Sequence, residues 1–372
     1  MLQRNLSIIS VFFAIFMLYV VVFSLPWGKL VFGIFFLYSF CVTRLGSRDY
    51  LNYLFSAFLL AFLYSLISVT KGGEWAVIMS SAFSCVFLLS FYIFVVLFKG
   101  RSQKDIMTSL KLISYTFLFY LIFLMVLAVF FPGLLREVDL LDSNLAVAWY
   151  DLMPRVILKT MVLIGPFSFI AIYSTNRVYL VSVLFLIVAI LTQEVMAVFL
   201  VVVSVLINLI ISRKFFVLLL SAFTFIALLY GVADLVYEAK YDSIHEKLSQ
   251  LSGFVALLSV DPLLGIGLGN SLYGVGLNIE HVRFIEIVPL DYLIKGGVLG
   301  LFFFSILYLF PVWFGYQKYR SSGRQIFLVF SICHFLLVLS GLSNPYMHSG
   351  TLAFLFPSMI FAYSYLIRRK HI

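Results

Sequence analysis

Long apolar stretches dominate this chain of 372 residues and constrain its fold more than any other feature. A helix that crosses a bilayer needs roughly 20 mostly apolar residues, and its backbone polar groups must be satisfied within the protein. Hydrophobic residues make up 63% of the chain and charged residues only 11%, whereas a soluble domain is about a quarter charged. We therefore predict an all-α polytopic membrane protein that forms a single transmembrane domain. The twelve predicted spans cover approximately residues 7–25, 28–43, 50–70, 75–98, 109–132, 157–174, 178–193, 195–212, 215–233, 288–316, 325–342 and 349–367.

The charged residues predict how these twelve spans are oriented. If the N-terminus is cytoplasmic and the spans alternate, the cytoplasmic loops hold 16 of the 25 Lys and Arg residues and only two acids, Asp49 and Asp105. The external segments hold the other 9 basic residues and 14 of the 16 acids, so the two sides carry net charges of +14 and −5. This asymmetry follows the positive-inside rule. It explains the overall charge of +9 without any binding of nucleic acid. It also predicts that both termini are cytoplasmic.

Neither a metal centre nor a disulfide nor a cofactor is expected. Cys41, Cys85 and Cys333 all lie in apolar stretches, and the external His and carboxylate residues lack the spacing of a metal site. The apolar stretch after Arg4 is longer than a signal peptide and has no small-residue cleavage site. We therefore expect it to be retained as the first span.

Two external segments are long enough to hold structure of their own. In segment 133–156, Asp142 or Ser143 suits the cap of a short helix that Pro154 would limit. Segment 234–287 begins, over about 235–260, with apolar residues at steps of three and four. That spacing predicts an amphipathic helix on the outer leaflet or over the bundle. A glycine-rich loop of residues 261–287 follows it.

Three closely spaced glycines, Gly265, Gly267 and Gly269, open this loop. Glycine permits positive φ and a close approach of backbone to a ligand, and successive exposed N–H groups can bind an anion. The same pattern fits a re-entrant turn, and the Lys-Ser/Thr pair of a Walker loop is missing. Phosphate binding by this backbone and a structural turn are both open at this point.

Ionisable residues gather where the loop enters span ten. Pro289 suits a first helical turn, where the helix dipole favours the carboxylate of Asp291. Asp291 and Lys295 are spaced to form an i,i+4 ion pair, but ionisable groups at membrane depth are also candidates for function. Glu286 precedes the helix, at the mouth of the bundle, where a carboxylate suits a general base.

The region of about 235–305 resembles the O-antigen ligase and polysaccharide polymerase superfamily. The likeness rests on the amphipathic external helix, the sequence PLLGIGLG at 262–269 and the sequence LIKGGVLG at 293–300, which opens a helix. Ligases of this superfamily typically carry a His-Asn pair about eleven residues before the glycine that matches Gly297. This chain has Glu286 and Ile287 there, which looks more like the Wzy-type polymerases. The resemblance implies a fold like that of GT-C glycosyltransferases.

The resemblance also implies a reaction, on the outer face of the bacterial inner membrane. A hydroxyl of one undecaprenyl-pyrophosphate-linked oligosaccharide attacks the anomeric carbon of another, and undecaprenyl pyrophosphate leaves. Glu286 or Asp291 would accept the hydroxyl proton, and cations would stabilise the pyrophosphate. A separate chain-length regulator and a flippase are implied as partners. The candidate pyrophosphate ligands are Arg136, Arg155, His281, Arg283 and Lys295.

Three other functions stay open. A ligase of the same fold would transfer finished polymer to lipid A core, although the missing His-Asn pair argues against it. A polysaccharide flippase or other transporter can also have twelve spans, but the chain shows no matching halves and its charges cluster in outer loops. A structural membrane subunit without activity is the third, and the glycine-rich outer loop argues against it.

Overall fold

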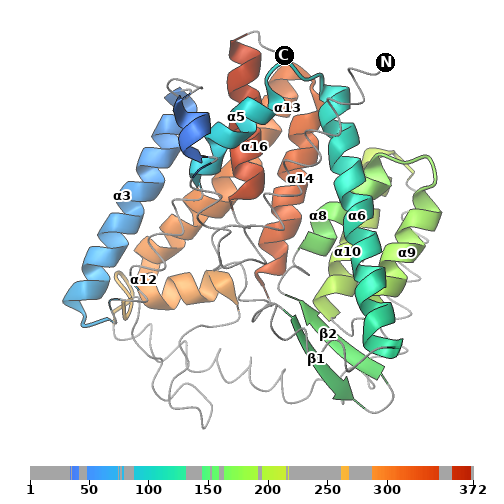
Figure 1. Cartoon of the computed structure of the whole chain (residues 1–372). Helices are drawn as coiled ribbons and strands as arrows, with labels where there is room; N and C mark the ends of the chain where they lie inside the picture. Colours follow the sequence, from blue (N-terminus) through green and yellow to red (C-terminus); the bar gives the residue numbers. More distant parts are fainter. Residues whose placement is uncertain are drawn as a thin grey trace.

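A computed structural model shows a bundle of helices with one small β-hairpin (Figure 1). The structure describes residues 34, 36–41, 48–73, 75, 78, 88–130, 145–150, 153–158, 163–191, 195–214, 217, 261–267, 287–342 and 354–369. Predicted span 7–25, all of predicted span 215–233 except residue 217, the amphipathic helix of 235–260 and both chain ends lie outside these residues. The count of twelve spans and the location of the termini therefore stay predictions.

Three helical stretches in the described part are long and apolar enough to cross a membrane. They are α3 (Arg48–Thr70), most of α6 (Gln103–Phe130), and a continuous run of α12 (Val288–Phe304), the π-helix η4 (Ser305–Leu309) and α13 (Phe310–Ser322). The shorter helices are α5 (Ser90–Phe98), α8 (Ile164–Tyr173), α9 (Val178–Leu191), α10 (Val195–Ile211), α14 (Gln325–Ser340) and α16 (Leu355–Arg368).

The outward faces of the long helices are apolar, as contact with lipid requires. Phe62 on α3 and Phe119 on α6 are 63% and 69% exposed. Exposed aromatic side chains on this scale would be costly in water, where large apolar patches are rare on monomers. The prediction of a helical protein is confirmed in the described part, and its long apolar helices support the prediction of a membrane protein.

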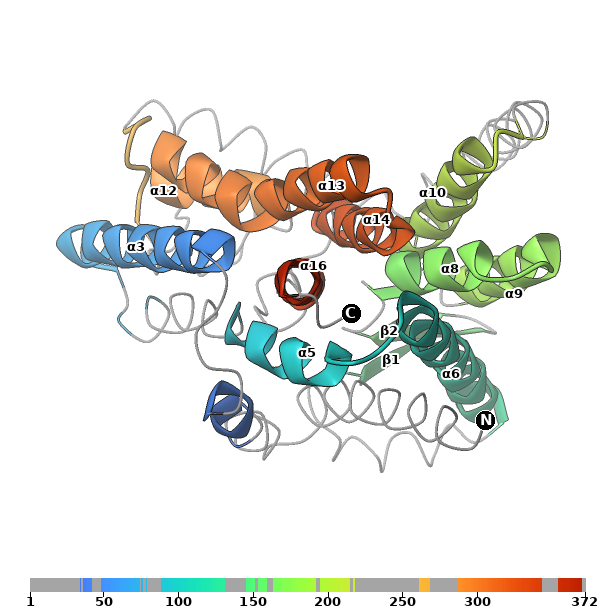
Figure 2. The ribbon, with the colours of Figure 1, turned by 90° about the horizontal axis from the view of Figure 1, so that it is seen from above.

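Helix α16 lies at the centre of the bundle when the molecule is seen end-on (Figure 2). Its residues 355–366 are all buried, and α5, α13 and α14 pack around it. Phe361 of α16 stacks on Tyr53 and Phe314 with ring centroids 4.8 and 4.7 Å apart. Because lipid is as apolar as the side chains, such close packing supplies the cohesion that the hydrophobic effect supplies in water.

Basic turns gather at one end of the bundle. Asp49, at the start of α3, forms ion pairs with Arg368 at the end of α16 and with Lys318 near the end of α13. Lys111, near the start of α6, donates a 2.9 Å hydrogen bond to the carbonyl of Ser174 after α8. These contacts bring together, at the upper end in Figure 1, loops that the charge count predicts to be cytoplasmic.

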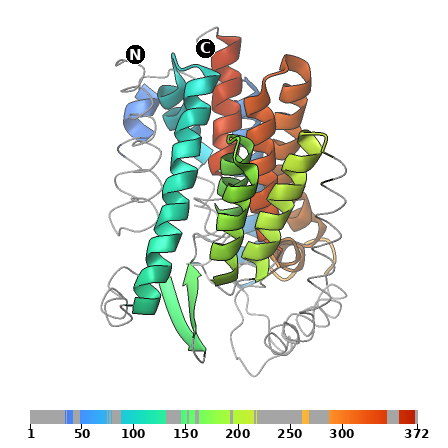
Figure 3. The ribbon, with the colours of Figure 1, turned by 90° about the vertical axis from the view of Figure 1, so that its right-hand side faces the viewer.

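The segment before α8, which the charge count predicts to be external, forms a β-hairpin. Strands β1 (Leu145–Tyr150) and β2 (Met153–Leu158) pair antiparallel, at the lower end of α6 (Figure 3). The predicted short helix capped by Asp142 or Ser143 and the predicted start of span six at residue 157 are therefore wrong. Aromatic and β-branched residues favour strands, and Pro154 is tolerated because both strands are edges.

Helices α13 and α14 lie in close contact at Gly315. A Cβ atom added there would overlap Oγ of Ser331 on α14 and lie 3.1 Å from Cδ1 of Ile360 on α16. This glycine therefore fixes how tightly the C-terminal helices pack, in the way small residues do in membrane bundles.

Gly315→Ala is expected to destabilise the protein by about 1–3 kcal/mol, because the added methyl overpacks this contact. Thermal unfolding of the purified protein in detergent measures the change. Adding Ser331→Ala removes the overlapping hydroxyl and should restore much of the loss. An unchanged unfolding midpoint for Gly315→Ala would contradict the packing.

Candidate functional site at the lower end of the bundle

Helix α12 is interrupted at Gly297, which has φ 58° and ψ −148°, outside the helical region. An unbroken helix would bond the N–H of Val298 to the carbonyl of Ile294, and the N–H of Leu299 to that of Lys295. Instead, these two N–H groups donate to the carbonyls of Pro262 at 3.0 Å and Leu263 at 3.4 Å.

The same loop segment also satisfies the two vacated carbonyls. The N–H of Ile266 donates to the carbonyl of Ile294 at 3.0 Å, and the N–H of Gly267 donates to that of Lys295 at 2.8 Å. All four backbone groups released by these two missing helical bonds are therefore paired again. This matters because an unsatisfied backbone group away from water costs about 1–3 kcal/mol. We call residues 261–267 the docking segment.

Glycine is required where the docking segment meets the break. Gly265 and Gly297 both have positive φ, 63° and 58°. A Cβ on Gly265 would lie 2.6 Å from the N atom of Gly297, and a Cβ on Gly297 would lie 2.6 Å from the carbonyl oxygen of Pro262. Gly265, Ile266 and Gly267 direct their N–H groups to carbonyls of the protein. For Gly265 and Gly267 the geometry supports a structural turn over an anion cradle, whereas Gly269 lies outside the described residues.

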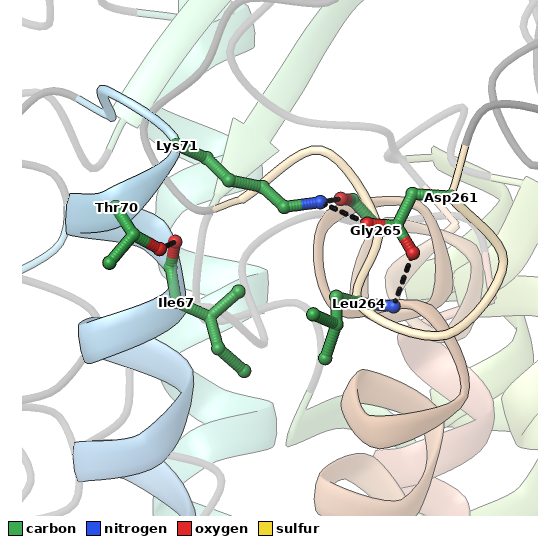
Figure 4. A network of polar contacts seen from close by, with 6 residues as sticks. All are labelled: Ile67, Thr70, Lys71, Asp261, Leu264 and Gly265. Carbon is green, nitrogen blue, oxygen red and sulfur yellow. Dashed lines mark hydrogen bonds and ion pairs between the residues drawn. The ribbon is translucent and has the colours of Figure 1, made fainter.

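A lysine at the end of α3 clamps the docking segment (Figure 4). Nζ of Lys71 donates to Oδ2 of Asp261 at 2.5 Å and to the carbonyl of Gly265. Oδ1 of Asp261 accepts a 3.0 Å hydrogen bond from the N–H of Leu264. These bonds, that of Lys71 foremost, hold the pKa of the Asp261 carboxyl below its usual range, so the carboxylate is charged at neutral pH.

Asp291 and Lys295 form the predicted ion pair, and it is buried. Nζ of Lys295 lies 2.8 Å from Oδ1 and 3.1 Å from Oδ2 of Asp291, and the two side chains are only 1% and 4% exposed. Ions removed from water in this way are stable only when paired. The pair therefore belongs to the interior of the protein rather than to its wet surface.

The first part of α12 does not span the bundle but crosses its end. The N–H of Val288 bonds to the carbonyl of Gly341 after α14 at 2.9 Å, while Gly296 packs against the ring of Tyr64 on α3. Figure 1 shows this part running across the lower end and the part after Gly297 rising towards α13. The predicted span 288–316 therefore includes a crosswise segment, and Asp291 lies at the end opposite the basic turns.

Two buried polar groups near these helices were not anticipated from the sequence. Tyr64 is 2% exposed, its hydroxyl has no hydrogen-bond partner among the described residues, and the Asp291 carboxylate interacts with it electrostatically. His334 of α14 is fully buried, and neither ring nitrogen makes a full hydrogen bond within the described part, although the backbone of Tyr308 interacts with it.

Some of these residues carry a signal in the sequence and others do not. A tyrosine in an apolar span looks like an ordinary core residue, whereas a lone histidine in such a span is a candidate functional residue. Lys71 was also missed, although a cation directly after a span that is predicted to run outward departs from the positive-inside pattern.

Most of the other predicted site residues lie outside the described part. Arg155 belongs to β2, where it pairs with Ala148 of β1, on the hairpin at the lower end of the bundle. The predicted residues that lie outside the described part are Arg136, His281, Arg283 and Glu286.

A scan against protein-family models finds no match, and a search of the curated proteins finds none either. The likeness to the O-antigen ligase and polymerase superfamily therefore rests on the motifs of this chain alone.

Lys295→Met is expected to destabilise the protein by about 3–5 kcal/mol, because it removes the charge partner of a buried carboxylate. The double variant Asp291→Leu with Lys295→Met should recover most of that loss, since an apolar pair of similar volume often replaces a buried ion pair at little cost. Unfolding of the purified protein in detergent measures both. Wild-type stability in Lys295→Met alone would contradict a buried pair.

Proposed function

We propose that this protein is a membrane glycosyltransferase that polymerises undecaprenyl-pyrophosphate-linked oligosaccharide repeat units. The observation that carries the proposal is the buried Asp291–Lys295 pair, which lies in a broken helix beside a docking segment whose sequence resembles that of such polymerases. The positive-inside rule assigns the basic end of the bundle to the cytoplasm. The site then faces the outer side of the bacterial inner membrane, where lipid-linked repeat units are joined.

The proposed step forms one glycosidic bond and breaks one bond to phosphate. The hydroxyl oxygen of the acceptor unit bonds to the anomeric carbon of the donor chain. The bond from that carbon to the pyrophosphate oxygen breaks, and undecaprenyl pyrophosphate leaves with the bonding electrons. A carboxylate accepts the hydroxyl proton, and cations stabilise the charge on the leaving group.

Of the two candidate bases, Glu286 suits the proton transfer better. Both oxygens of Asp291 contact Lys295, and the Asp291 side chain is 4% exposed, so a sugar hydroxyl does not reach it in this conformation. Glu286 stands two residues before α12, which ties it in sequence to the same end of the bundle. We therefore assign the base to Glu286 and a positioning role to Asp291 and Lys295.

The same burial removes Lys295 from the candidate pyrophosphate ligands, because its ammonium group is enclosed with Asp291. Arg155 stays a candidate, since its strand lies at the same end of the bundle as α12. Arg283 and His281 stay candidates through their position in the loop before Glu286, and Arg136 through its position before the hairpin.

One observation favours a second function, the translocation of a lipid-linked oligosaccharide. Transporters place discontinuous helices and buried charges at their substrate sites, and α12 is discontinuous and carries a buried ion pair.

A ligase would share the fold of the polymerase and differ in its acceptor. Cells lacking a polymerase attach single repeat units to the outer lipid, whereas cells lacking a ligase attach none.

Purified protein supplied with lipid-linked repeat units, extracted from a strain that lacks it, is expected to produce a ladder of longer chains. Glu286→Gln should slow chain elongation by about 100-fold or more, because it removes the general base. Glu280→Gln, in the same loop, is the matched control and should elongate at the wild-type rate.

Two outcomes would contradict the proposal. Translocation of the repeat unit across a bilayer without elongation by the wild type would favour the transporter. Elongation by Glu286→Gln at the rate of Glu280→Gln would remove Glu286 from the chemistry.

A further inference from the structure

We propose that α12 is a two-state helix, which is broken while the docking segment is bound and continuous when the segment leaves. This inference follows from the hydrogen bonds of the break and does not depend on the proposed function. In this proposal the docking segment, residues 261–267, can leave α12, and it keeps the helix broken for as long as it is bound.

The four hydrogen bonds at the break can be exchanged for two helical ones. The N–H groups of Val298 and Leu299 are held by the carbonyls of Pro262 and Leu263. The helical acceptors of these N–H groups, the carbonyls of Ile294 and Lys295, are held by the N–H groups of Ile266 and Gly267. When the segment leaves, the same two donors and two acceptors can join each other as i→i−4 bonds, so α12 keeps its backbone paired in both states.

Gly297 makes both states accessible. Its φ of 58° is available to glycine at little cost, whereas most other residues avoid it. Rotation of this one residue into the helical region closes the helix. Contacts with the docking segment oppose that rotation, because Gly297 lies directly against the backbone of Pro262 and Leu263.

The docking segment is built to be released towards water. The Leu263 side chain is 63% exposed, so the outer face of the segment is open. The Lys71–Asp261 clamp is itself 26% and 32% exposed, so its attraction is screened by salt and far weaker than that of a buried pair. Solvent can therefore take over the polar groups that the segment would leave behind.

Closure of the helix would move the Asp291–Lys295 pair. The crosswise part of α12 is tied to Gly341 after α14 and to Tyr64 on α3, and it cannot keep both contacts while continuing in line with residues 298–304. Release of the docking segment therefore moves the pair from one position to another. A ligand that binds one of the two states more tightly shifts the balance between these positions, by its difference in affinity for the states.

Hydrogen exchange at single amides of the full-length protein in lipid nanodiscs tests this inference, with Gly297→Ala as the main variant. Alanine disfavours the broken state, so the Ile266 and Gly267 amides should exchange about tenfold faster or more. The Val298 and Leu299 amides should change by less than about threefold, because they regain helical partners. Gly323→Ala is the matched control: Gly323 has a φ of 67° but nothing within 4 Å of an added Cβ, so all four amides should exchange as in the wild type.

A second variant keeps the test decisive if Gly297→Ala does not fold. Lys71→Gln weakens the clamp without touching α12, and should speed exchange at Ile266 and Gly267 while sparing Val298 and Leu299. Faster exchange at all four amides together would show that the helix unfolds with the segment, and would overturn the proposal. Unchanged exchange at Ile266 and Gly267 in the variants that fold would overturn it as well.

Discussion

The backbone hydrogen bonds between the docking segment and α12 determine the arrangement of this end of the molecule. A helix inside a folded protein breaks at little cost only when each freed donor and acceptor finds a partner. Here a segment some thirty residues earlier in the chain supplies partners for the four groups of the two missing helical bonds. The break turns the first part of α12 across the bundle, and the Asp291–Lys295 pair is buried there as a result.

The rest of the bundle provides a packed frame for this break. α16 is enclosed by α5, α13 and α14, and basic turns are tied together at the opposite end through Asp49. Tyr53 joins α3 to the π-helix η4, because its hydroxyl donates a 2.9 Å hydrogen bond to the carbonyl of Leu307. A π-helix leaves carbonyls without their usual partners and often marks a functional site. The run from Val288 to Ser322 thus has two irregular parts, the break at Gly297 and the π-helix. The docking segment, which is clamped to α3, holds the first, and α3 itself holds the second.

Local patterns in the sequence were sufficient for some of these features and not for others. Apolar length predicted the membrane helices, Pro289 predicted the start of α12, and the i,i+4 spacing predicted the pair of Asp291 and Lys295. The break at Gly297 was not predictable, because its cause is the distant docking segment and a Gly-Gly step is compatible with a helix. The clamp of Lys71 joins residues 190 positions apart. The hairpin was missed because a single proline was interpreted as a helix limit, whereas strand pairing depended on two segments meeting.

The sidedness of the two ends of the bundle is the property on which the proposed chemistry depends, and cysteine labelling in cells measures it. In a variant without Cys41, Cys85 and Cys333, Leu263→Cys and Ser322→Cys place single thiols on the docking segment and on the basic end, both exposed. A membrane-impermeant maleimide should label Leu263→Cys in intact spheroplasts, and Ser322→Cys only after lysis. Labelling of both thiols from the same side, or of Ser322→Cys alone from outside, would contradict an outward-facing site.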